Sequence, residues 1–163
     1  MPVSVPIGST IQAEGTYPPG GSIPIGKGIE GASQAYKKGA PLINSSGKLV
    51  IASGAPLDTA DSIVGFALRD ATGVTDSEVL YVPALKGIIV FSAMLEDNVN
   101  FNHVLAQANQ YTKYVILEDT TSKAWFLDEN NTTNGIALVI GFQSDVGTTK
   151  GRVYFILTGG TLA

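Results

Sequence analysis

The chain has 163 residues, of which 44% are apolar and only 15% are charged, and its formal net charge is −4. This composition excludes a disordered chain, and an acidic balance without a basic cluster argues against nucleic acid as a main partner. The absence of cysteine excludes disulfides, thiolate catalysis and cysteine–zinc sites. Apolar runs of about six residues are too short for a membrane helix, which needs roughly 20, so no membrane partner is expected.

Residues 1–35 differ from the rest of the chain, because they hold five of the eight prolines and show no helical or strand period. Isolated apolar residues are spaced through them: Ile7, Ile11, Tyr17, Ile23, Ile25 and Ile29. So few apolar side chains do not offset the conformational entropy lost on ordering the segment. We therefore expect an extended N-terminal arm over residues 1–35 that docks on a partner, followed by one domain over residues 36–163.

From Tyr36 onward, short apolar runs alternate with turn residues. Pro41–Asn44 and Lys48–Ala52 flank Ser45-Ser46-Gly47, which predicts a hairpin. Further strands are expected over residues 62–68, 79–82, 87–91, 113–117, 124–127, 136–142 and 152–157. The one helical candidate is Phe101–Ala108. The pattern predicts an all-β fold, a small antiparallel β-barrel or sandwich, with at most one short helix.

Two of the expected strands are apolar at every position. Ile88-Ile89-Val90-Phe91 and the run from Ile136 to Ile140 show no alternation. An antiparallel strand with one face in water usually alternates, so the second face of these strands should be covered as well. We expect association of subunits, with Ile88, Val90, Phe91 and Tyr154 at the oligomer interface. A central strand in a tight sandwich would explain the same pattern.

Motifs that would mark an enzyme are weak. His103 is the only histidine, and no G-x-S-x-G motif provides it with a nucleophile. The carboxylate pairs Glu96-Asp97, Glu118-Asp119 and Asp128-Glu129 are expected in solvated turns, and no calcium-loop spacing is present, so no metal is predicted. Gly26–Gly31 fits G-x-G-x-x-G, but no helix pattern follows it. We predict a protein that is not an enzyme and needs no cofactor.

Three passages carry a family resemblance. The first is a basic Gly-Pro turn, Lys37–Pro41, that leads into a hairpin and the strand Ile63–Ala67. The second is Val82–Ala93, and the third combines Ala124–Asp128 and Val139–Phe142 with Gly151–Phe155. Over about three quarters of the chain, this order resembles the head decoration, or cement, proteins of tailed bacteriophages.

The resemblance implies a β-rich homotrimer on the outer surface of the virion capsid, where it holds major capsid protein subunits together. Its partners would be the major capsid protein and further copies of the chain. The arm and its root are then expected to contact the capsid, through Ile7, Ile11, Tyr17, Ile23, Ile25, Lys27, Lys37 and Lys38.

Two other functions stay open at this point. A glycan-binding fibre or adhesin module would use Trp125, Tyr111 and Tyr114 as a stacking platform. Hydroxyl groups of the sugar would then bind to the amides of Asn130, Asn131 and Asn134. A small hydrolase would rely on His103.

Overall fold

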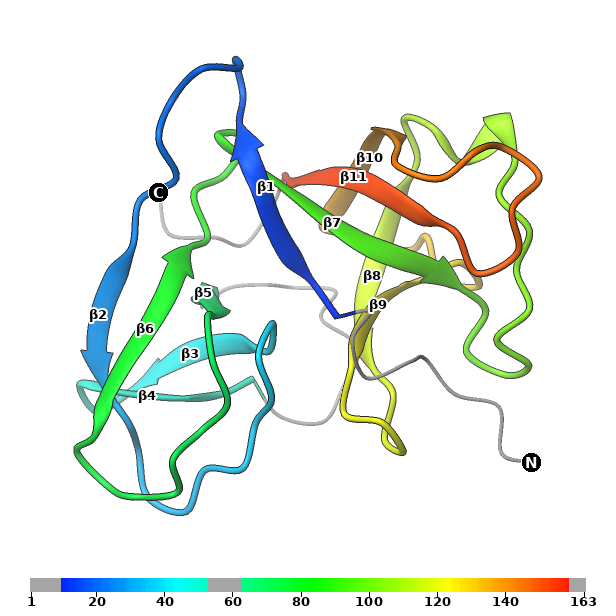
Figure 1. The fold of residues 1–163 in the computed structure, drawn as a ribbon. Helices are drawn as coiled ribbons and strands as arrows, with labels where there is room; N and C mark the ends of the chain where they lie inside the picture. Colours follow the sequence, from blue (N-terminus) through cyan, green and yellow to red (C-terminus); the bar gives the residue numbers. More distant parts are fainter. Residues whose placement is uncertain (1–9, 53–62, 159–163) are drawn as a thin grey trace.

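The computed structural model describes residues 10–52 and 63–158. Residues 1–9, 53–62 and 159–163 lie outside this part, and Ile7 lies among them. The chain is nearly all β, with 45% strand and 2% helix, as the sequence predicts. The strands form two sheets that lie side by side (Figure 1).

The first sheet has six strands. In spatial order they are β1 (Gln12–Thr16), β7 (Ile89–Glu96), β11 (Arg152–Leu157), β10 (Ala137–Phe142), β8 (Lys113–Glu118) and β9 (Trp125–Asp128). Strand β9 also pairs in parallel with the end of β7, through Leu95 opposite Leu127. The sheet therefore closes on itself as a small barrel, and β1 is added along the first half of β7.

The second sheet has five antiparallel strands. In spatial order they are β2 (Gly26–Ile29), β6 (Glu78–Pro83), β5 (Ile63–Ala67), β3 (Pro41–Ser45) and β4 (Lys48–Ile51). A bridge between Glu30 and Leu49 brings its two outer strands together. The buried Glu30 carboxylate also accepts hydrogen bonds from the Thr72 N–H at 2.9 Å and the Gly73 N–H at 2.7 Å. These bonds attach the loop between β5 and β6 to the end of β2.

One continuous hydrophobic core runs through both sheets. Phe66 of β5 contacts Phe91 of β7 with a centroid separation of 4.7 Å. Phe91 in turn stacks on Phe155 of β11 at 5.7 Å. Because large aromatic side chains from both sheets share this contact, the two sheets fold as one unit.

The expectation of an extended arm is wrong for residues 10–35. Strand β1 pairs with β7 and strand β2 pairs with β6. Ile11 is buried in the shared core. The glycines that hide a strand pattern in β2 have a packing role, because a Cβ at Gly26 would lie 2.3 Å from the ring of Tyr81. Later strands supply the hydrogen bonds and apolar contacts that the segment lacks by itself.

The predicted helix over Phe101–Ala108 is also wrong. The Asp97 carboxylate accepts the backbone N–H groups of Val99, Asn100 and Asn102, which fixes a loop. Phe101 has a φ of 51°, which no right-handed helix allows. Its ring packs instead against Phe126, at 5.4 Å. In the described residues, helical structure is limited to the single 3-10 turn Gln107–Asn109.

Candidate interaction surface

Strands β7, β10 and β11 carry apolar side chains on the outside of the barrel as well as inside it. Along β11, Val153, Phe155 and Leu157 are buried, and the residues between them are only half-buried. Ile156 lies opposite Leu138 of β10, so their side chains meet on the outer surface. We call this surface the outer apolar face and define it by the half-buried residues Val90, Leu138, Ile140, Tyr154 and Ile156.

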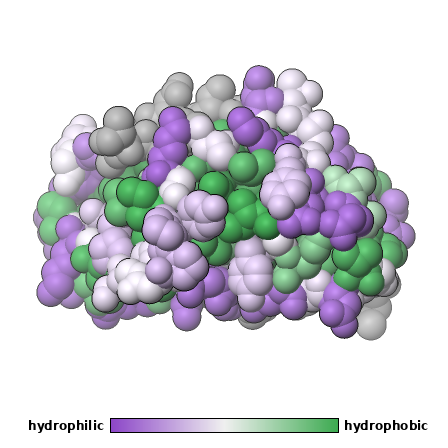
Figure 2. Space-filling view, turned by 90° about the horizontal axis from the view of Figure 1, so that it is seen from above, coloured by the Kyte–Doolittle hydropathy of each residue, from purple (hydrophilic) through white to green (hydrophobic). Residues whose placement is uncertain are grey.

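A groove of about 600 Å³ borders the outer apolar face. Val90, Ile140 and Tyr154 form one side of it, and residues 14–17 and 19–21 form the other. Tyr17 is 57% exposed and Ile88 is 48% exposed at the same end of the molecule, where the Tyr17 N–H donates to the Ile88 carbonyl. The view from above shows apolar side chains gathered near the middle of this side (Figure 2). The sequence predicts Ile88, Val90 and Tyr154 at an interface. Val90 and Tyr154 line this groove together, and Ile88 lies at its end beside Tyr17.

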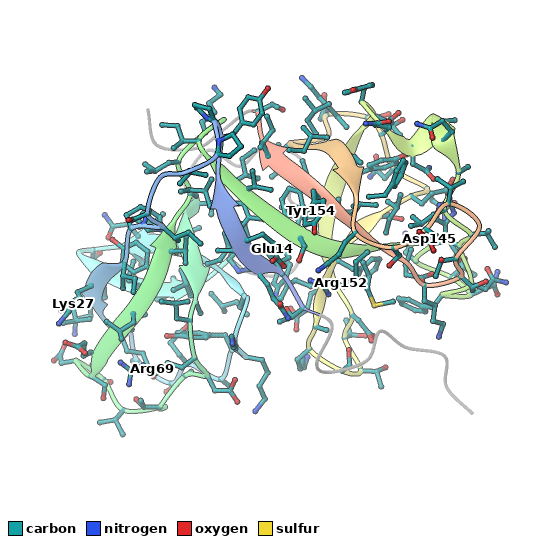
Figure 3. All side chains as sticks on the ribbon, turned by 45° about the horizontal axis from the view of Figure 1, so that its top comes forward. Glu14, Lys27, Arg69, Asp145, Arg152 and Tyr154 are labelled. Carbon is teal, nitrogen blue, oxygen red and sulfur yellow. The ribbon has the colours of Figure 1, made fainter. Side chains whose placement is uncertain are left out.

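A partly buried polar network fixes β1 beside this face, with Ser92 and Thr10 buried and Glu14 at the surface (Figure 3). Arg152 donates to the Ser92 hydroxyl at 2.8 Å and to the Thr10 carbonyl at 3.1 Å. The Ser92 hydroxyl donates to the Glu14 carboxylate. Burial lowers the pKa of Arg152, and the negative charge of Glu14 opposes that shift. Since these contacts join β1, β7 and β11, they hold the groove in one shape.

Phe91 is the one predicted interface residue that the structure excludes. Its side chain is fully buried between Phe66 and Phe155. In strand β7 the side chains alternate, so Val90 points outward where Phe91 points into the core. The assignment of Phe91 to an oligomer interface is therefore wrong.

The predicted capsid-contact residues do not form one surface. Ile11 belongs to the core, so its assignment to capsid contact is wrong. Ile23 packs against that core, whereas Tyr17 lies at the groove beside the outer apolar face. A second groove of about 360 Å³ at the junction of the two sheets is lined by residues that include Ile11, Ile23, Ile25 and Lys38. We call it the junction groove.

The two remaining lysines are in exposed ion pairs. Lys27 lies 3.5 Å from the Glu78 carboxylate and Lys37 lies 3.0 Å from the Asp70 carboxylate. The backbone N–H of Lys38 and the Lys37 side chain lower the pKa of Asp70. Exposed pairs of this kind add little stability, so both lysines remain accessible to a partner.

Three of the neighbouring carboxylates, Glu96, Asp119 and Asp128, are buried rather than solvated. Glu96 and Asp128 lie opposite one another at the ends of β7 and β9. One Glu96 oxygen accepts the His103 N–H at 3.1 Å, and the other has no hydrogen-bond partner among the described residues. Burial raises the pKa of Glu96 to about 7 and also raises the pKa of Asp128. The expectation that these groups are solvated is therefore wrong for all three residues, and the loop after β7 covers Glu96 and Asp128.

His103 lies beside this pair without the partners of a catalytic triad. Its ring contacts the Asn109 amide oxygen at 3.2 Å and lies 3.9 Å from the Glu129 carboxylate. Within residues 10–52 and 63–158, no hydroxyl bonds to the His103 ring. The same residues contain no group of three or more histidine and carboxylate side chains suited to a metal ion. The arrangement does not provide a nucleophile for hydrolysis.

The stacking platform expected for a glycan site is not assembled. Trp125 and Tyr114 are buried, and only Tyr111 of the three is exposed. The Tyr114 hydroxyl accepts a hydrogen bond from the Asn109 amide inside the protein. A sugar ring cannot stack on side chains that the fold covers, so this set of residues is wrong as a binding site.

Comparison with protein-family models and with curated proteins finds no match for this chain. In the part of the chain that the structure describes, no helix is long and apolar enough to cross a membrane.

Proposed function

We propose that this protein is a structural virion protein. As an oligomer, it binds the outer surface of a phage head and stabilises the lattice of major capsid protein subunits. The observation that carries the proposal is the outer apolar face, which lies on the three neighbouring strands β7, β11 and β10. Scattered apolar side chains are normal on a protein surface, but a contiguous set marks an interaction site.

The outer apolar face suits association with copies of the same chain. Leu138 of β10 lies opposite Ile156 of β11. The pairing of Phe155 with Phe91 leads toward Ile156 and Val90, which indicates that Val90 of β7 extends the same row. Tyr154 adds an aromatic ring with a polar end, the type of side chain that is enriched at interfaces. In an oligomer, the outer apolar face contacts other copies, while the second sheet remains available for the capsid.

The capsid contact is proposed at residues that remain exposed. Ile25 is 62% exposed. Lys27 of β2 and Lys37, which precedes β3, lie in exposed ion pairs. Each contact is weak alone, but several copies joined in one oligomer bind with a high effective concentration. No catalytic step is part of this function.

Co-sedimentation with heads of the parent phage tests the proposal. The wild-type chain should pellet with the heads, and Ile156→Lys should lose most of the bound fraction because it breaks the oligomer. The matched control is Val74→Lys, since Val74 is 63% exposed on the loop between β5 and β6, outside the outer apolar face. Wild-type protein that stays in the supernatant overturns the proposal, and so does an equal loss in both variants.

A further inference from the structure

Strand β1 has a free edge. It is the last strand of its sheet, and within the described residues its second edge pairs with no other strand. The junction groove begins at this edge, where Ile11, Gln12 and Ala13 form one wall. The opposite side is largely apolar and includes Phe66, Leu68 and Val82 from the second sheet. An open edge beside an apolar groove is the geometry in which an extended segment adds as a further strand.

The segment before β1 matches this geometry in sequence. Residues 1–9 read Met-Pro-Val-Ser-Val-Pro-Ile-Gly-Ser, with no charged side chain. Val3, Val5 and Ile7 alternate with other residues, so in a strand their side chains share one face. The backbone N–H and C=O groups of successive residues also point to opposite edges of a strand. Val3, Val5 and Ile7 therefore form hydrogen bonds along one edge, and Pro2 and Pro6 lie on the other edge. Proline is tolerated only on such an unpaired edge.

The described residues occupy the space that a hairpin at the start of β1 would need. A segment that turned back at Thr10 to lie along β1 of the same copy would run beside Ile11. That space is taken by Gly39, where a Cβ would lie 2.6 Å from the Ile11 carbonyl oxygen and 2.6 Å from the Thr10 side chain. The free edge begins only beyond this point. A segment that arrives from another molecule has no such turn to make.

We propose that Val3–Ile7 of one copy adds as a strand to β1 of a second copy and places its apolar side chains in the junction groove. The five residues of the segment match the five residues of β1 in length. This inference shares one assumption with the proposed function, namely that copies of the chain associate. The exchanged strand is a second contact between copies, besides the outer apolar face. In a closed ring, each copy gives one strand and receives one.

Disulfide cross-linking between copies tests the exchange, because the natural chain has no cysteine. The Val5→Cys variant is mixed with an Ile25→Cys variant that carries a tag, so that the two chains differ in mass. The mixture is then oxidised. The expected product is a mixed disulfide dimer on a non-reducing gel. Val5→Cys mixed with Val74→Cys is the matched control, since Ile25 is 62% and Val74 is 63% exposed. Equal cross-linking in both mixtures overturns the proposal.

A competition experiment on the same full-length mixture adds a second readout. A synthetic peptide of residues 1–9 should suppress the cross-link, and the same peptide with Val5→Asp should compete about tenfold less well, because a charge is costly in an apolar groove. Equal competition by both peptides contradicts the proposed binding mode. A Val5→Cys/Ile25→Cys double variant is oxidised in the same way. A product that is monomeric and linked within one chain also contradicts the exchange between copies. These experiments contain no phage heads. A failure of strand exchange can therefore be distinguished from a failure of head binding.

Discussion

The buried carboxyl of Glu96 makes stability depend on pH in an unusual direction. Burial raises its pKa from 4.5 to about 7 in the folded protein, although the His103 N–H and the charge of Lys150 oppose the shift. Between these two pH values the folded chain holds a proton that the unfolded chain has lost. Stability from this group is therefore present below pH 4.5 and is lost as the pH rises to about 7.

The magnitude follows from the shift. At about 1.36 kcal/mol per pKa unit, ionisation of Glu96 costs the folded state about 3 kcal/mol. Glu96→Gln removes the titration, so its free energy of unfolding relative to wild type should rise by about that amount between pH 4 and pH 8. Any cost of the unpaired amide is the same at every pH and does not affect this difference.

Urea denaturation of both proteins across this pH range measures the effect. Asp128→Asn should change in the same direction, because burial also raises the pKa of Asp128. Asp70→Asn should change in the opposite direction, because the Lys38 N–H and the Lys37 side chain lower the pKa of Asp70. A stability difference between Glu96→Gln and wild type that stays flat with pH would refute the reasoning.

Three further predictions follow from the packing and the buried charges. Phe91→Ala should cost about 3–5 kcal/mol in denaturant unfolding, because it empties the contact between the two sheets; a cost below 1 kcal/mol would place this contact outside the core. Gly65→Ala should be strongly destabilising, since its Cβ would lie 2.3 Å from a backbone carbonyl, whereas Gly15→Ala meets nothing within 4 Å; equal melting temperatures would contradict this packing. Glu30→Gln should lower the pKa of Tyr36 from about 12 but leave it above 10, because burial is the larger cause and the charge of Glu30 the smaller one; an NMR titration that shows no change would disprove the influence of that charge.

The sequence predicts the strands that follow Tyr36 well. The hairpin of β3 and β4 and the strands β8 to β11 lie where apolar runs and turn residues place them. The same pattern predicts that Val90 and Tyr154 are partly exposed. A strand with apolar residues on both faces exposes some of them when one face lies on the outside of the barrel. Local periodicity is sufficient where strands are regular and their residues bulky.

The sequence fails where structure depends on distant partners. Strand β1 contains Gly15 and a bulge, and β2 contains two glycines, so neither shows a period of two until β7 and β6 lie beside them. The burial of Glu96 could not be predicted either, because it depends on the loop that Asp97 and Phe101 shape. A run of apolar residues does not show which alternate positions point inward, so the sequence predicts Phe91 at an interface although the fold buries it.

The mass of the protein in solution tests the central claim most directly. Sedimentation equilibrium of the wild-type chain should give an oligomer, a trimer if the resemblance to decoration proteins holds, and Ile156→Lys should give a folded particle of lower mass. A wild-type chain that remains monomeric at its highest soluble concentration would contradict the claim that the outer apolar face binds other copies.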